Sequence, residues 1–435
     1  MTSLSLASQL LEQEARALLS RLARVRPFAL TDTMVPAAAL SPVAQTAIES
    51  YLASGRRNLK QQVLEFINWL SGAEGRKAAP AEMQRRFTAV RLQFNVVLTQ
   101  FDVFSIVMTQ RSEHDTGVWL SGLDVVAADA LQLSDYYQAP PVVCYLDRGM
   151  GAAIRRARTR LPGGGGKSPV AVIRFPRERM VGSRIASSLV HEVGHQAAAL
   201  LGLVGSLRDA LRRQERDRKD SLWRLWERWI LEIVADFWSV AKVGVVSTLG
   251  LIGVVSLPRA FVFRLNLDDP HPVPRLRVKI SCALGEALYP NPQWKRLGTL
   301  WESYYPRNGL DPQRSELMTR LENAIPQFLA LLLNHRPQAL RGKSLIEVLK
   351  IEDRQPDRFA TLFQTWRNSR RQMLRTPPAL AFAVIGQARA DGLLAPEQES
   401  NLTANLLTHW ALRSTLDTLA LCAALPQLRL GAPVT

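Results

Sequence analysis

The stretch from about Gly182 to Leu203 constrains the fold of this chain most strongly, because its apolar helical pattern contains the H-E-x-x-H run His191–His195. Residues four apart lie on one face of a helix, so the imidazoles of His191 and His195 can turn toward one metal ion. Two neutral imidazoles suit zinc, and Glu192 is placed to accept a proton from a water molecule that the ion activates. The spacing therefore predicts a helix that carries a metal site.

A second apolar helix, expected over about Ser221–Val243, offers a third metal ligand. Glu232 lies in its most apolar part, where an unpaired carboxylate would be costly and coordination of a dication removes that cost. Asp236 lies four residues further along the same face and can accept the N–H of a ligating histidine. The alternative is a buried ion pair between Glu232 and an arginine such as Arg224 or Arg228.

Together these motifs resemble the gluzincin metallopeptidases, which pair H-E-x-x-H with a later helix bearing E-x-x-x-D. The run Glu232–Asp236 is similar to the E-x-x-A-D form of CAAX-prenyl protease and its bacterial heat-shock relatives. The segment Asp269–Arg275 looks like the His-Pro element with a following arginine in those relatives. The resemblance covers about Ile185–Arg277, under a quarter of the chain. It implies a zincin-like fold and peptide hydrolysis, with zinc (Zn²⁺) on His191, His195 and Glu232 and with Glu192 as general base.

Two further residues, His271 and Arg275, are candidates for stabilising the reaction's developing charge. Hydrolysis of an amide builds negative charge on the carbonyl oxygen, and a nearby cation or N–H donor lowers that barrier. Either side chain could be this donor; equally, Asp268–Pro274 could be a rigid, proline-fixed loop with a surface histidine. The β-type run Val170–Phe175 could pair with an extended substrate.

The remaining pattern predicts a mostly α-helical protein in three regions. Apolar residues recur at helical spacing in residues 1–114, an N-terminal helical region, and in residues 291–435, a C-terminal helical region. Between them, residues 115–290 combine the two motif helices with short β-type runs on either side of a basic stretch, 149–160, that we expect to be helical. We therefore expect a central zincin-like α+β metallopeptidase lobe flanked by helical regions.

The charge of the chain bears on its partners. With 55 basic and 38 acidic residues it carries a formal charge of +17, which permits contacts with nucleic acid or acidic surfaces. The arginines are scattered and lack the interleaved aromatics of a nucleic-acid module, so nucleic-acid binding is not favoured. The uncharged run 243–258 is shorter than the roughly 20 residues of a membrane span. It predicts a buried helix or hairpin, and membrane association through it is not favoured.

The location and function of the chain follow as expectations. Three cysteines, far apart and odd in number, fit a reducing compartment, and the amphipathic N-terminus lacks the features of a secretory signal. We expect a cytoplasmic zinc metallopeptidase acting on protein or peptide substrates, with signal-independent export still open. Two alternatives remain: a non-catalytic interaction protein with a structural zinc site, and a basic nucleic-acid-associated factor. The sequence indicates no oligomeric state.

Overall fold

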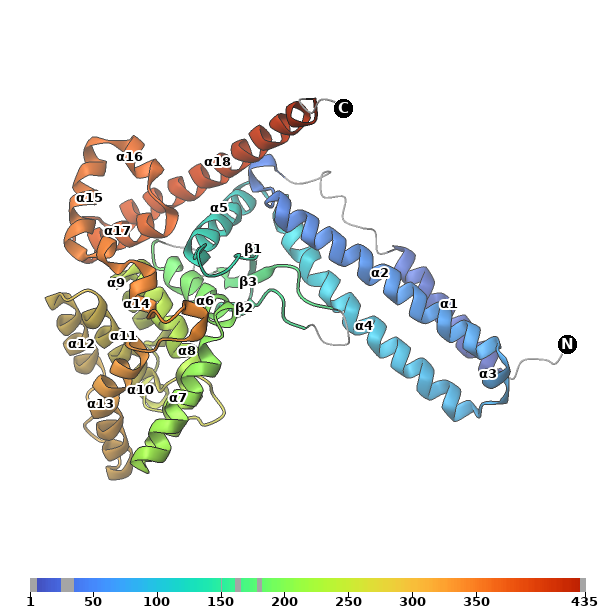
Figure 1. Cartoon of the computed structure of the whole chain (residues 1–435), viewed down its shortest axis with the longest axis horizontal. Coiled ribbons are helices and arrows are strands. Elements are labelled where there is room, and N and C mark those ends of the chain that lie inside the picture. Colours follow the sequence, from blue (N-terminus) through green and yellow to red (C-terminus); the bar gives the residue numbers. More distant parts are fainter. Residues whose placement is uncertain (1–5, 25–34, 150, 161–165, 178–181, 431–435) are drawn as a thin grey trace.

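The computed structural model of the chain is mostly helical, with a small three-stranded sheet near its middle (Figure 1). This confirms the expected mostly α-helical class. The structure describes five stretches of the chain, residues 6–24, 35–149, 151–160, 166–177 and 182–430.

The N-terminal region forms a long helical arm that extends away from the rest of the molecule (Figure 1). Helices α1 (Leu6–Arg24), α2 (Pro42–Ser71) and α4 (Pro80–Gln110) lie side by side, and the short α3 (Ala73–Lys77) joins the last two. Both long helices begin at a proline, whose fixed φ and missing N–H suit the first helical turn. Their buried apolar faces form one core, as the helical spacing predicts.

The sheet contains β1 (Val142–Asp147), β2 (Ala153–Arg155) and β3 (Ala171–Pro176) in the order β1-β3-β2. β1 runs parallel to β3, whereas β2 is antiparallel to it. The prediction that 149–160 is helical was wrong, because pairing with β3 outweighs the local preference of so short a segment. The idea that Val170–Phe175 binds substrate was also wrong, since β3 is paired along both of its edges.

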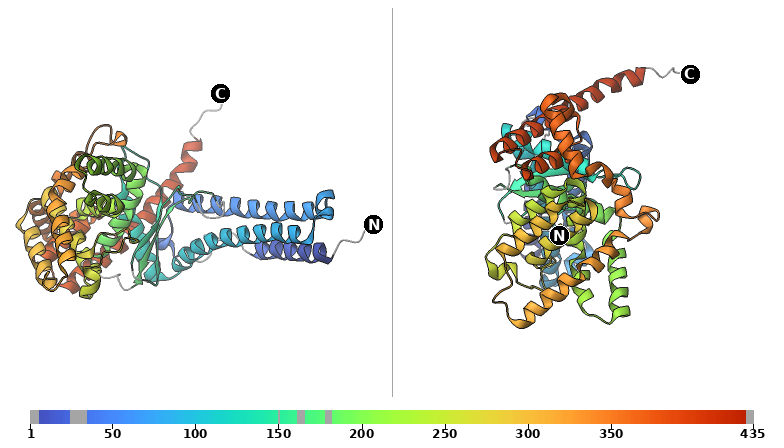
Figure 2. Two further views of the ribbon diagram at one scale, coloured as in Figure 1. Left: turned by 90° about the horizontal axis from the view of Figure 1, so that it is seen from below. Right: turned by 90° about the vertical axis from the view of Figure 1, so that its left-hand side faces the viewer.

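Alternate residues of the sheet face two different cores. Cys144 and Ile173 point into the core of the main body, whereas Val143 and Val172 join the core of the arm. This alternation follows from the two-residue period of a strand. The sheet therefore lies between the arm and the body, which Figure 2 shows from the side.

The body is built around two motif helices. Helices α6 (Ile185–Leu200) and α8 (Leu222–Val243) pack against each other, and α7 (Leu203–Arg218) connects them and lies along α8. Helix α5 (His114–Leu131) packs on both β1 and α6. The tryptophans of α8 are core residues, since Trp223, Trp226, Trp229 and Trp238 are all buried.

The uncharged run 243–258 turns at Gly244, which has a φ of 58°, and then forms α9 (Val245–Val255). Helix α9 is largely buried and packs against α6, so the prediction of a buried helix is confirmed. Within the part of the chain that the structure describes, one helix, α4, is long and apolar enough to cross a membrane by length and composition.

The remaining helices complete the body. They are α10 (Arg259–Val262), α11 (Pro274–Leu288), α12 (Pro292–Tyr304), α13 (Pro312–Leu333), α14 (Leu345–Leu349), α15 (Pro356–Asn368), α16 (Arg370–Arg375), α17 (Pro378–Ala390) and α18 (Pro396–Leu430). Side chains from α13 to α18 join the same hydrophobic core as α5, α6 and α8; for example, Phe328 stacks on Trp226 with ring centroids 4.3 Å apart. The division of the chain at residues 114 and 290 stays a prediction.

Candidate metal centre

The close packing of α6 on α8 depends on a glycine inside the H-E-x-x-H run. A Cβ atom at Gly194 would lie 2.9 Å from Cα of Ala235 and 3.0 Å from Cβ of Trp238. Any larger residue would therefore push the two helices apart. Because Gly194 lies next to His195, this close approach also sets the distance between the histidines of α6 and Glu232 of α8.

We expect Gly194→Ala to destabilise the fold by about 1–3 kcal/mol, the usual cost of overpacking a close contact. Gly205→Ala on α7 is the matched control, because a Cβ there meets nothing within 4 Å. That change should instead stabilise α7 by about 0.5–1 kcal/mol. Urea unfolding of both variants measures the difference. Equal stability of the two would contradict the close packing of α6 on α8.

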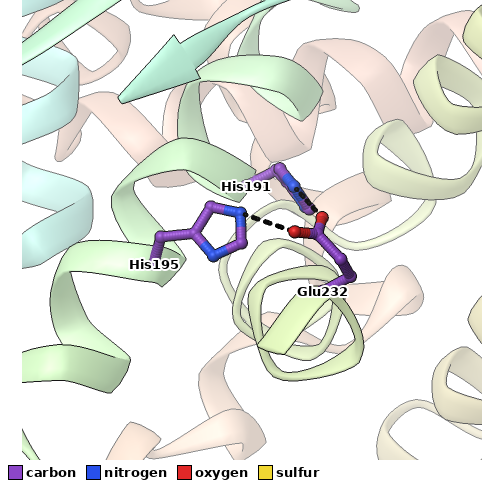
Figure 3. Close-up of side chains that lie close together, drawn as sticks. All are labelled: His191, His195 and Glu232. Carbon is purple, nitrogen blue, oxygen red and sulfur yellow. Dashed lines mark ion pairs between the residues drawn. The ribbon is translucent and has the colours of Figure 1, made fainter. Parts of the chain in front are cut away.

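Three side chains converge where α6 crosses α8 (Figure 3). Nε2 of His191 lies 3.3 Å from Oε2 of Glu232, and Nε2 of His195 lies 3.6 Å from its Oε1. Around a tetrahedral ion with bonds of about 2.0–2.1 Å, neighbouring ligand atoms stand roughly 3.3–3.4 Å apart. The ligand atoms of the three residues all lie within 4.8 Å of one another. This group could therefore hold a metal ion, as the H-E-x-x-H and E-x-x-x-D spacings predict.

The pKa of each residue in this group depends on the charges of its neighbours. Burial opposes protonation of His191, but the neighbouring carboxylate of Asp236 outweighs burial and raises the pKa of His191 to about 9. Burial and the nearby His191 lower the pKa of His195 to about 4. Burial alone would raise the pKa of Glu232, yet the close contacts with His191 and His271 hold it far below its ordinary value. The two carboxylates of α8 therefore favour positive charge beside them, which either protonation of His191 or a bound metal ion would supply.

Asp236 lies beside His191, on the opposite edge of the ring from Glu232. Its Oδ1 lies 2.8 Å from Nδ1 of His191, which leaves Nε2 of that ring free to face Glu232. The guanidinium of Arg277 donates two hydrogen bonds to Asp236, from Nε to Oδ2 at 2.7 Å and from Nη2 to Oδ1 at 2.8 Å. Glu232 forms its ion pairs with the histidines and, at 3.8 Å, with Arg277. Arg224 pairs with Glu215, so the arginine beside Glu232 is Arg277, which lies closer to Asp236 than to Glu232.

Arg277 is the site residue that sequence reasoning missed. Its side chain is 10% exposed and lies against both carboxylates of α8. The charges of α8 could have indicated it. Glu232 and Asp236 are two buried carboxylates on one helix face, and such a pair requires a buried cation.

His271 and Arg275, the two residues predicted to stabilise a negatively charged oxygen, lie in different places. Nε2 of His271 is 3.1 Å from Oε2 of Glu232, and its Nδ1 is 2.6 Å from Oδ1 of Asp269. The ring is 44% exposed, so a bound molecule could reach it. Arg275 points away from the metal group, toward Glu322 at 3.3 Å and the backbone carbonyl of Tyr305. The placement of Arg275 in the site was therefore wrong.

A cavity of about 200 Å³ opens beside the metal group. Glu192 lines it, and burial, with the neighbouring Glu232, raises the pKa of the Glu192 carboxyl despite the opposing charge of His191. The other walls come from the metal group, from the residues that precede β2, and from the start of α6 and the length of α9: Gly151, Ala152, Ser187, Ser188, His191, Asp236, Ser247, Leu251, Val254, His271 and Arg277. The candidate base Glu192, the metal-ligand residue His191 and two N–H donors, His271 and Arg277, thus share one cavity.

No family model, curated protein or solved structure matches this chain. The gluzincin resemblance therefore depends on the motif residues and on their arrangement in space.

Proposed function

We propose that this protein is a zinc-dependent metallopeptidase of the gluzincin type, which hydrolyses peptide bonds of protein substrates. The observation that supports it most is that Glu192 lines the same cavity as His191, which belongs to the group of three residues that could hold a metal ion. A structural zinc site is closed by four protein ligands, whereas a catalytic site has three and leaves a position open. The three-residue group found here fits the catalytic kind.

The chemistry that the residues can perform follows from their positions. A zinc ion, when bound, lowers the pKa of water and polarises a carbonyl group. Glu192 accepts a proton from the attacking water and returns it to the leaving amine. Its raised pKa suits this task, because a base whose pKa lies closer to the working pH both takes and gives a proton readily.

Of the two predicted residues, His271 is the better candidate for stabilising the negatively charged oxygen. It lines the cavity and is partly exposed, so its N–H can approach the oxygen that becomes negative. Arg277 also lines the cavity, but its fork is occupied by Asp236, so we assign it a positioning role.

The strand that could hold an extended peptide is β2, in place of β3. β2 lies at the edge of the sheet, and Gly151 and Ala152, directly before it, line the cavity. A peptide that adds to an open strand edge gains backbone hydrogen bonds without sequence requirements. A small sheet beside the two motif helices is also the arrangement expected of a zincin-like lobe.

The metal content of the purified protein and of two variants tests the proposal. We expect about one zinc ion per wild-type chain, and loss of that zinc in Glu232→Ala, since one of three ligands is removed. Glu322→Ala is the matched control, because Glu322 is an equally buried carboxylate that pairs with Arg275 and should leave zinc in place. Absence of zinc from the wild type after reconstitution would contradict the proposal and favour an interaction protein.

A further inference from the structure

A groove of about 580 Å³ lies between α7 and α8 and is lined by charged side chains. On α7, Arg208, Arg212 and Arg216 follow one another at intervals of four and form a single stripe. On α8, Arg224 and Arg228 repeat the same interval and face them. Glu215 and Glu227 complete the lining. We call this surface the arginine groove.

The arginine groove carries an excess of positive charge. Glu227 pairs with Arg212 at 2.7 Å, and Glu215 pairs with Arg224. The other three arginines, Arg208, Arg216 and Arg228, form no ion pair within the part of the chain that the structure describes. Five cations against two carboxylates leave three positive charges without a counter-charge, which is the property of a site for an anionic partner.

The arginine groove runs along the same helix that supplies the third metal ligand. Arg228 and Arg224 precede Glu232 by one and two turns of α8, which corresponds to a rise of about 6 and 12 Å. Helix α7 follows α6 directly and continues beside α8 (Figure 1). An extended peptide rises about 3.3 Å per residue, so roughly two to four residues span the rise along α8 from Glu232 to these arginines.

We propose that the arginine groove binds an acidic segment of the polypeptide substrate, a few residues from the bond that is cleaved. This inference rests on the proposed peptidase function and adds a substrate class to it. The planar guanidinium fork of arginine pairs with a carboxylate through two parallel hydrogen bonds, which favours aspartate and glutamate side chains as the ligands.

The composition of the arginine groove favours a peptide over a nucleic acid. Glu215 and Glu227 lie among the arginines and would repel a continuous line of phosphates, whereas a peptide can place its carboxylates between them. Among the described residues that line the groove none is aromatic, so it offers no surface on which bases could stack.

Binding to the Glu192→Gln protein tests the inference without turnover. Fluorescence anisotropy compares a labelled peptide that carries a run of aspartates with a matched peptide that carries asparagines. The triple variant Arg208→Gln, Arg216→Gln, Arg228→Gln should weaken binding of the acidic peptide by about tenfold, given the modest strength of exposed charge pairs. The control triple, Arg367→Gln, Arg370→Gln, Arg371→Gln, removes the same charge from exposed positions on α15 and α16 and should leave binding unchanged.

The outcomes separate this inference from the proposed function. Equal binding of the two peptides, or equal losses in the two triple variants, would overturn the arginine groove as a site for acidic peptide. Tighter binding of a single-stranded RNA oligomer, lost only in the groove variant, would overturn the peptide as its ligand. Because anisotropy needs neither zinc nor hydrolysis, failure of the peptidase proposal would appear separately, in the metal analysis and in the wild-type cleavage rate.

Discussion

Replacing Glu192 with glutamine will lower the rate of peptide hydrolysis by a factor of about 10²–10⁴ and leave the zinc content unchanged. Glutamine has nearly the same shape as glutamate, so the cavity keeps its form, but its amide cannot accept the proton. Glu192 does not belong to the group of three metal-ligand residues, and the ion should therefore stay bound. The measurement pairs zinc analysis with initial rates of cleavage of an unfolded protein substrate.

The Glu322→Gln variant is the control for this result. Glu322 is also buried, yet it pairs with Arg275 away from the cavity, so the same chemical change should leave the rate close to that of the wild type. The non-catalytic alternative makes the opposite prediction for Glu192, because a protein that only binds its partner loses nothing when its base is removed. Unchanged cleavage by Glu192→Gln would assign the activity to a contaminant and support that alternative.

The part of the site that the sequence predicts correctly is the part fixed by local helix geometry. His191 and His195, like Glu232 and Asp236, are four residues apart on strongly apolar helices, so each pair has to share a helix face. The charges then decide how the two helices meet, since buried carboxylates and imidazoles are stable only in contact with one another or with a metal ion. Long periodic segments such as α2, α4 and α8 were predictable for the same reason.

The parts that the sequence does not predict depend on contacts between distant segments. β2 is only three residues long, and its hydrogen bonds come from β3, which begins only at Ala171. Arg275 and Arg277 lie two residues apart on α11, so they point to nearly opposite sides of that helix. Which of the two reaches the metal group depends on how α11 packs between α8 and α13, and no local pattern contains this information.

Replacing Arg277 with methionine will destabilise the metal-free protein by about 3–5 kcal/mol, because it leaves buried carboxylates without their cation. Zinc affinity should also fall by about 10–100-fold, since Asp236 loses the partner that fixes its position against His191. Urea unfolding followed by tryptophan fluorescence measures the first effect, and competition with a chelator of known affinity measures the second.

The Arg275→Met variant distinguishes a role in the site from a role in the fold. Arg275 is a buried arginine of the same helix and also pairs with a buried carboxylate, Glu322. Its loss should also reduce stability, although by less, because Lys279 and Arg307 still pair with Glu322. It makes no contact with the metal group, and zinc affinity should therefore stay at the wild-type level. Equal loss of zinc affinity in both variants would mean that the site responds to the stability of α11 as a whole. A loss in Arg277→Met alone would assign the orientation of His191 to the chain of contacts from Arg277 through Asp236.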